Sequence, residues 1–517
     1  KHAFKGDSRH ASFSSRSLGS CDRSRMRITV IVIAAAAVIV PVVSYLSFKK
    51  RVRELRDQLH DNEGNQLPSP EPSFLVGNRE LKHEYYKTIY SHATESNAPA
   101  TLLWIGSDPF LVLNCEEGVQ HALSGGHTYI KPRYVGYRSQ VVKAGIESQK
   151  DAYLHQVDDT DASRRRFNQV IASKLPVLVS SMKDFTASLP SGSFIDVHPL
   201  MQEVFVRLNV FVLFDYSGDV SGVAGTILSA GGEFSKRMLD PLRAWYHWPS
   251  TFSFIRDVFR LLKLGRNLVA HLDKTDNTWV HAWIARKKLT SFQYFGKVLG
   301  LVMASTQTVP LTSMWLLHLL AAHPDVREKA LDEIHRVLPD GRDPSYTDLE
   351  QCEYLGHIVH ETLRLYPPFP LLQREAVVDD SLDGYSIPAG TKVYVVPWLI
   401  HHHPRYWSNP HEFRPERFEK GPTGDSPSIH TYIPFGRGPR MCAGSGLAIV
   451  EMKLIAIYML RSHMWKCDPP KEKMSLYPDV NMMPLPKIRF LFERLGSFPL
   501  EETTSNGHIL SDEEASK

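Results

Sequence analysis

Long apolar stretches alternate with amphipathic ones along much of this chain, and this pattern predicts a mainly helical fold. Residues Phe295–Ala322 are apolar on nearly every side, as in a helix buried within a large protein. This helix is expected to end at His323-Pro324, where an amphipathic helix running through Val337 begins. A further apolar helix is predicted over Leu447–Met459.

A small β portion is predicted beside these helices. Leu102–Ile105 and Phe110–Leu113 have strand-like composition, and a turn at Gly384–Gly390 precedes the apolar strand Lys392–Trp398. We therefore expect a mainly α fold with a small β portion (α+β), formed by a globular domain over residues 74–495.

An uncharged run of roughly 20 residues near the N-terminus, Ile28–Phe48, consists largely of Ile, Val and Ala. At about 1.5 Å per residue, a helix of this length reaches about 30 Å and can cross a bilayer. The run therefore predicts an N-terminal transmembrane helix. A cleaved signal peptide, the competing interpretation, would have a shorter apolar region and a small-residue cleavage site. Basic residues are more numerous after the run than before it, which favours a cytoplasmic location for the C-terminal part.

The segments around the anchor and at the C-terminus are polar. Residues 1–27 form a basic leader rich in Ser and Arg, and an organellar presequence is an alternative interpretation of it. Residues 49–73 are expected to be a basic and proline-rich linker, because Leu67–Pro72 has the composition of a semi-rigid spacer. Residues 496–517 form a polar tail that is expected to be disordered.

Composition narrows the class of protein. The chain has 517 residues and a net charge of +4, which is too small to favour a nucleic-acid partner. Its five cysteines lack regular spacing, which argues against a disulfide scaffold and favours a reducing compartment. The sequence contains no Walker loop, H-E-x-x-H motif or complete G-x-G-x-x-G motif, so it has no evident nucleotide or flavin module of its own.

The most informative motif is F-x-x-G-x-R-x-C-x-G, formed by Phe435, Gly438, Arg440, Cys442 and Gly444. It places Cys442 in a glycine-rich loop that leads directly into an apolar helix. A thiolate there would face the positive end of the helix and nearby backbone N–H groups. Arg440 would lie beside it, where a guanidinium suits a carboxylate partner. A buried structural cysteine is the alternative interpretation.

A second motif lies upstream, where Glu361 and Arg364 are three residues apart and therefore share one helical face. Their helix is rich in apolar residues and is stopped by Pro367-Pro368, which predicts that the pair is buried rather than an ordinary surface pair. A buried ion pair needs further hydrogen bonds to be tolerated.

Taken together, these motifs resemble those of the cytochrome P-450 family, the haem-thiolate monooxygenases. The resemblance implies the cytochrome P-450 fold and haem b as the cofactor, with Cys442 as the proximal ligand of the iron. It implies that Arg440 pairs with one haem propionate and that Arg374 grips the other. It also implies that Phe435, Gly438 and Gly444 shape the haem-binding loop.

The family's P-E-R-F run corresponds to Pro415–Phe418 in this sequence. The resemblance implies that Arg417 completes a structural triad with Glu361 and Arg364, which holds the loop behind the haem. The run His401–His403 is expected to be a solvated turn, because consecutive residues cannot all face one metal ion.

The family's A-G-x-[DE]-T motif, counted back from His-Pro, falls on Ala304–Thr308. Ala304 and Thr308 match, and the resemblance places Ala304 against the haem and makes Thr308 and Gln307 the predicted catalytic residues. Gln307 replaces the family's acid and cannot release a proton at working pH. Water would then carry the proton relay in a slower monooxygenase. Simple back-bonding of Thr308 to the preceding turn is the alternative to a catalytic role.

The family's W-x-x-x-R motif, which covers a haem propionate, is missing, because no tryptophan lies between Val142 and Leu175. Arg164, Arg165 and Arg166 are candidates for the cation, and the sequence does not choose among them. Two other functions follow from these departures: an isomerase or dehydratase of lipid hydroperoxides, and a non-catalytic haem-binding protein.

The resemblance implies a single-pass enzyme of the endoplasmic reticulum membrane with its catalytic domain in the cytoplasm. It would insert one oxygen atom from O2 into an apolar small molecule, either a lipid, a sterol, a terpenoid or a xenobiotic. Its electrons would come from NADPH through a separate reductase, with cytochrome b5 as a further candidate partner.

Overall fold

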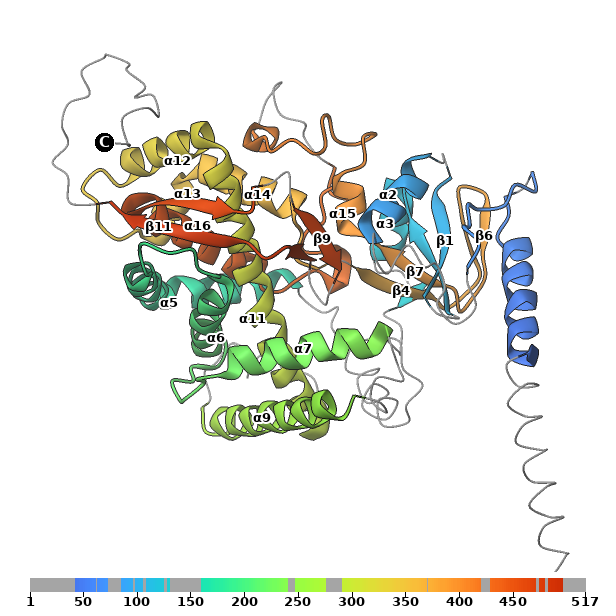
Figure 1. The fold of residues 1–517 in the computed structure, drawn as a ribbon, viewed down its shortest axis with the longest axis horizontal. Helices are drawn as coiled ribbons and strands as arrows, with labels where there is room; N and C mark the ends of the chain where they lie inside the picture. The colour runs from blue at the N-terminus through green and yellow to red at the C-terminus, as the bar shows by residue number, and fades with distance from the viewer. Residues whose placement is uncertain are drawn as a thin grey trace, which may run out of the picture.

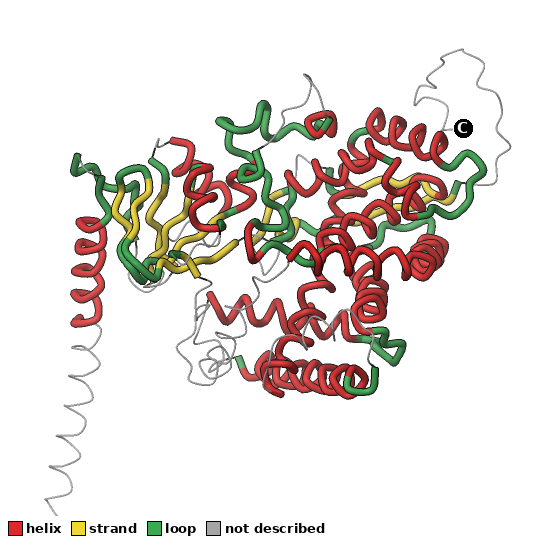
Figure 2. The backbone as a smooth tube through the Cα atoms, turned by 180° about the vertical axis from the view of Figure 1, so that it is seen from behind, coloured by secondary structure: helices red, strands yellow, loops and turns green. Residues whose placement is uncertain are grey.

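A computed structural model describes residues 42–495, apart from 62, 73–84, 96–97, 106–107, 125–127, 131–159, 240–246, 276–290, 370, 420–427, 471–473 and 479–481. A helix-rich part and a sheet-rich part lie side by side in both views (Figures 1 and 2). The predicted mainly α fold with a small β portion is confirmed.

Most of the described helices surround the largest hydrophobic core, and the others contribute to smaller cores beside the strands. The helices are α2 (Tyr85–Glu95), α3 (Glu116–Leu123), α5 (Thr160–Ser188), α6 (His198–Phe214), α7 (Val223–Leu239), α9 (Trp248–Leu272), α11 (Ser291–Ala322), α12 (Pro324–Val337), α13 (Tyr346–Gln351), α14 (Glu353–Leu365), α15 (Pro397–His401) and α16 (Ser445–Ser462). Two short 3-10 helices, η2 (Pro415–Phe418) and η3 (Gly438–Arg440), lie in the loops before α16.

Helix α11 is the central element of the helix-rich part, as its apolar sequence predicts. It packs against α6, α9, α14 and α16. Its buried side chains include Trp315 and Leu316, which belong to the largest hydrophobic core. Helix α12 begins at Pro324, directly after α11, so the predicted junction is confirmed.

The sheet-rich part contains one five-stranded sheet in the order β1-β2-β7-β4-β3, with β2 and β7 parallel and the other neighbours antiparallel. The strands are β1 (Ala100–Ile105), β2 (Asp108–Leu113), β3 (Tyr129–Ile130), β4 (Leu372–Ala376), β5 (Asp380–Leu382), β6 (Tyr385–Ile387), β7 (Lys392–Val395), β8 (His463–Asp468), β9 (Ser475–Pro478), β10 (Met482–Leu485) and β11 (Arg489–Arg494). Pairs β5-β6, β8-β11 and β9-β10 form two-stranded sheets.

The predicted strand Lys392–Trp398 is too long. Strand β7 ends at Val395, and Pro397 begins helix α15. Proline cannot donate a hydrogen bond to a strand ladder, and its fixed φ suits the first turn of a helix.

Most of the predicted transmembrane run Ile28–Phe48 lies outside the described residues. From residue 42 to 58 the chain is helical, so the predicted linker begins as a helix. Phe48 and Val52 of this helix are buried against Trp104 of β1. Among the described helices, we find none whose length and apolar character would let it span a bilayer.

Candidate active site

The Cys442 loop is a tight turn closed by one backbone hydrogen bond. The N–H of Cys442 donates to the carbonyl oxygen of Phe435 at 2.8 Å. Between them, Gly436 and Gly438 have φ of +68° and +70°, in the left-handed region that favours glycine. The Cys442 side chain itself is exposed. The loop therefore presents a thiol on its surface instead of burying it in the core, which is contrary to the structural alternative.

Two glycines fit this loop to its neighbours. A Cβ atom at Gly438 would lie 1.9 Å from the carbonyl oxygen of Leu123, the last residue of α3. Gly444 is the N-cap residue of α16, so this helix opens two residues after Cys442. The helix N-terminus carries a partial positive charge, which stabilises an anionic sulfur nearby.

Arg374 and Arg440 form a cationic pair. Arg374 of β4 is only 8% exposed, and its Nη1 donates to the carbonyl oxygen of Gln373 at 2.9 Å. Burial, and after it the positive charge of Arg440, lowers the pKa of Arg374 to about 10. No carboxylate among the described residues pairs with Arg374. Two neighbouring guanidinium groups fit an anionic ligand with two carboxylates, such as haem with its propionates.

The structure brings together Glu361, Arg364 and Arg417, all with fully buried side chains. Arg364 donates to Glu361 twice, from Nε to Oε2 at 2.7 Å and from Nη2 to Oε1 at 2.8 Å. The Nε of Arg417 donates to Oε1 of Glu361 at 3.2 Å. Arg364 also donates to the carbonyl oxygens of His401, Pro410 and Glu412. These extra bonds offset the desolvation of three buried charges.

One face of α11 is open at the predicted oxygen-side motif. Ala304 is exposed, although residues 309–320 of the same helix are all buried. The hydroxyl of Thr308 donates to the carbonyl oxygen of Ala304 at 3.2 Å, which is the back-bonding that the sequence left as an alternative. Gln307 faces another helix, because its Nε2 donates to the carbonyl oxygen of Ile227 in α7 at 3.3 Å.

The position of the missing W-x-x-x-R motif is only partly described. Residues 131–159 lie outside the described part of the chain, and α5 begins at Thr160. Arg165 and Arg166 are exposed on α5, whereas the side chain of Arg164 lies outside the description. The choice among these three arginines as a partner of the haem propionate stays open.

The prediction of a solvated turn at His401–His403 is wrong. The three residues are 0%, 3% and 8% exposed, respectively. Their segment is held inside the molecule because His401 ends the buried helix α15 and bonds to backbone groups on both sides. Within the part of the chain that is described, we find no group of His, Cys, Asp or Glu arranged to hold a metal ion.

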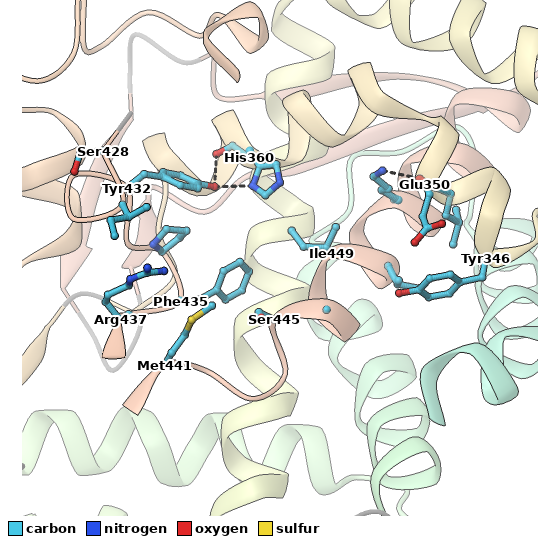
Figure 3. Close-up of a pocket in the computed structure, with 17 residues that line it drawn as sticks. Tyr346, Glu350, His360, Ser428, Tyr432, Phe435, Arg437, Met441, Ser445 and Ile449 are labelled. Carbon is cyan, nitrogen blue, oxygen red and sulfur yellow. Dashed lines mark hydrogen bonds between the residues drawn. The ribbon is translucent and has the colours of Figure 1, made fainter. Parts of the chain in front are cut away.

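A cavity of about 500 Å³ borders the Cys442 loop and was not predicted (Figure 3). Phe435 and Met441 of the loop, His360 of α14 and Ile449 of α16 line it. On one side, the hydroxyl of Tyr432 lies 2.9 Å from Nδ1 of His360. No local sequence signal marks this cavity, because its walls come from segments that are far apart in the chain.

Comparison with known proteins places these features in a family. The chain matches the family model Cytochrome P450 over residues 67–492, and it therefore belongs to the cytochrome P450 family. Members of this family bind haem b, so the predicted cofactor is confirmed at the level of the family.

Curated relatives match a part of the chain. It is 39% identical over 171 residues to Cytochrome P450 3A11 of Mus musculus, and 39% identical over 188 residues to Cytochrome P450 3A5 of Homo sapiens. The first alignment covers 33% of this chain and 34% of the relative, and the second covers 36% and 37%. The chain thus spans about a third of the length of these curated relatives.

Proposed function

We propose that this protein is a haem-thiolate monooxygenase that inserts one oxygen atom from O2 into an apolar small molecule. The observation that carries the proposal is the exposed Cys442 in its glycine loop at the start of α16, near the cationic pair Arg374 and Arg440. Haem b with a thiolate ligand supplies the activation of oxygen when it is bound. The substrate class is a lipid, sterol, terpenoid or xenobiotic.

The residues of the site have separate roles in this proposal. Cys442 Sγ would ligate the iron, and Arg374 and Arg440 would hold the propionates. The small side chain of Ala304 leaves room on the open face of α11. The Thr308 hydroxyl donates to the carbonyl oxygen of Ala304, and its lone pairs can accept a hydrogen bond from water. Gln307 would hold α7 against α11 rather than move a proton.

Electrons would come from NADPH through a separate reductase, with cytochrome b5 as a second candidate partner. The support is that the sequence contains none of the nucleotide motifs that an enzyme needs to bind NADPH or a flavin by itself. A mixture of the holoprotein, reductase and NADPH should therefore consume O2, and the holoprotein with NADPH alone should not.

The test of the thiolate is Cys442→Ser, compared with Cys467→Ser in β8 as a matched control. The reduced wild-type protein with carbon monoxide should show the absorption band of thiolate-ligated haem. Cys442→Ser should lose this band, and Cys467→Ser should keep it. Retention of the band and of turnover in Cys442→Ser would contradict the proposal.

An isomerase or dehydratase of lipid hydroperoxides is the second candidate function, and the observation that favours it is Gln307 at the position of an acid. Such a substrate carries its own O–O bond and needs neither reductase nor proton delivery. Turnover of a lipid hydroperoxide without NADPH would favour it. A non-catalytic haem protein, the third candidate, would bind haem but consume no NADPH with reductase across a panel of lipids and terpenoids.

We also propose attachment to the endoplasmic reticulum membrane through residues 28–48, with the catalytic domain in the cytoplasm. Helix α9 supports this with an exposed apolar stripe at helical spacing, formed by Trp248, Phe252, Ile255 and Phe259. Exposed cations flank the stripe, namely Arg256, Arg260 and Lys263. Such a face suits an anionic bilayer surface.

Flotation with vesicles that contain anionic lipid tests the contribution of α9. Phe252→Ser combined with Phe259→Ser should weaken binding of the full chain, whereas Phe369→Ser, an exposed aromatic outside α9, should leave binding unchanged. Equal binding by all three proteins would exclude α9 from the contact.

A further inference from the structure

His401 connects the buried triad to the segment that carries Cys442. Its Nδ1 lies 3.1 Å from the carbonyl oxygen of Arg364, and its Nε2 lies 2.9 Å from the backbone nitrogen of Ile433. In return, Nη1 of Arg364 donates to the carbonyl oxygen of His401 at 2.8 Å. The imidazole is therefore held at both ring nitrogens.

These partners determine the protonation of the ring. A carbonyl oxygen can only accept, so Nδ1 of His401 carries the proton that is donated to Arg364. A backbone N–H can only donate, so Nε2 accepts from Ile433 and carries no proton. The ring is neutral, with one defined tautomer, and each bond joins it to backbone rather than to a movable side chain.

Only a few backbone hydrogen bonds separate His401 from Cys442. Ile433 is 1% exposed, and its carbonyl oxygen accepts from the N–H of Gly436 at 3.0 Å, which starts the loop. Phe435 then accepts from Cys442 at 2.8 Å. A shift of Ile433 would therefore move both ends of the turn. On the other side, Arg364 is held by Glu361 and cannot follow such a shift.

From these contacts we infer that His401 is a positioning residue for Cys442. It transmits the rigid placement of the Glu361–Arg364 pair to the loop through Ile433. The inference deepens the proposed function, because it rests on Cys442 as the haem ligand. The neighbouring His402 makes no such link, since its Nδ1 bonds to Trp398 in its own helix.

The experiment compares His401→Phe, His401→Gln and His402→Phe in the full-length holoprotein. Phenylalanine fills the space of the ring but leaves the N–H of Ile433 and the carbonyl of Arg364 without a partner. Glutamine can replace both bonds from its amide group. Amide hydrogen exchange of residues 433–442 and the carbon monoxide band of the reduced protein are the two readouts.

His401→Phe should speed exchange in the loop by about tenfold or more, since loss of one hydrogen bond is commonly worth about that factor. It should also convert part of the thiolate band to the band of haem without thiolate. His401→Gln should restore both readouts in part, and His402→Phe should change neither.

The experiment distinguishes failure of the proposed function from failure of the role assigned to His401. A wild-type protein without the thiolate band would overturn the proposed function itself. A wild-type band that His401→Phe leaves intact, together with unchanged exchange in the loop, would overturn only the role of His401. Equal effects of His401→Phe and His402→Phe would reduce that role to general packing, and the inference would be wrong.

Discussion

At the scale of single residues, the carboxylate of Glu361 pairs with two guanidinium groups that have no access to water. Glu361→Gln would leave Arg364 charged and buried without an anion, and Arg417 with only the half-exposed carboxylate of Glu412 at 3.8 Å. We expect a loss of about 3–5 kcal/mol in the free energy of unfolding, measured by urea denaturation.

The matched control for this prediction is Glu54→Gln, which breaks the exposed pair of Glu54 with Lys50 at 3.5 Å. Surface pairs of this kind contribute little, so the expected change is below about 0.5 kcal/mol. Similar losses of unfolding free energy in the two variants would show that burial does not make the triad more stabilising than a surface pair.

The hydroxyl of Thr308 is expected to contribute to catalysis. Thr308→Ala should lower the fraction of NADPH consumption that yields product by about 10²-fold, the lower end of what a proton-handling group contributes. Thr312→Ala is the control, because the Thr312 hydroxyl is buried and bonds to the carbonyl of Thr308 at 2.9 Å. If both variants keep full coupling, Thr308 has only the back-bonding role.

At the scale of elements, the fit of the Cys442 loop against α3 depends on Gly438. Gly438→Ala combines a left-handed φ with a Cβ 1.9 Å from a backbone oxygen, so the loop must move. We expect this variant to lose the thiolate band of the reduced protein with carbon monoxide.

Gly436→Ala separates the two effects, because its φ is also left-handed but its Cβ would make only ordinary contacts, with the side chain of Leu372 at 3.7 Å and the backbone oxygen of Arg440 at 4.0 Å. It should cost about 1–2 kcal/mol in the free energy of unfolding and keep the band. Loss of the band in both variants would mean that backbone strain, rather than the contact with Leu123, shapes the loop.

Elements with a local signal were predictable from the sequence. The apolar periodicity of α11, the stop at His323-Pro324 and the three-residue spacing of Glu361 and Arg364 all depend on neighbours in the chain, and the structure contains each of them. The family profile confirms the resemblance that these motifs carry.

Features that depend on distant segments and that no family motif marks were not predictable. Three consecutive histidines look polar, and their burial follows only from the packing of α15 against the triad. The partner of Gln307 lies on α7, far from Gln307 along the chain. Such pairings are set by tertiary structure, which periodicity and spacing do not report.

At the scale of the whole molecule, buried neutral histidines make the fold sensitive to acid. Burial lowers the pKa of His198 and His360 to about 4 and that of His401 to about 3, from an ordinary value of 6.5. Below pH 6.5 these histidines bind protons in the unfolded chain but stay neutral in the folded protein. The stability is therefore fully present above pH 6.5 and is lost as the pH falls towards 4, by about 1.4 kcal/mol per pH unit for each group.

Urea denaturation at several values of pH measures this loss. His198→Asn removes one of these titrating groups, so the decline of the unfolding free energy with falling pH should become shallower. A free energy that stays constant between about pH 6.5 and pH 5, or the same slope in the variant, would contradict the assignment.

The helix at residues 42–58 is fastened to the rest of the protein at several points. Phe48 meets Trp104 edge to face, with ring centroids 5.4 Å apart, and both Lys49 and Arg56 pair with Glu71. With residues 28–48 as the proposed anchor, this helix connects the anchor to the domain rigidly rather than flexibly. A flexible connection would let the domain rotate freely above the bilayer. A rigid connection restricts its tilt and keeps one face of the domain turned towards the lipid, which dissolves apolar molecules.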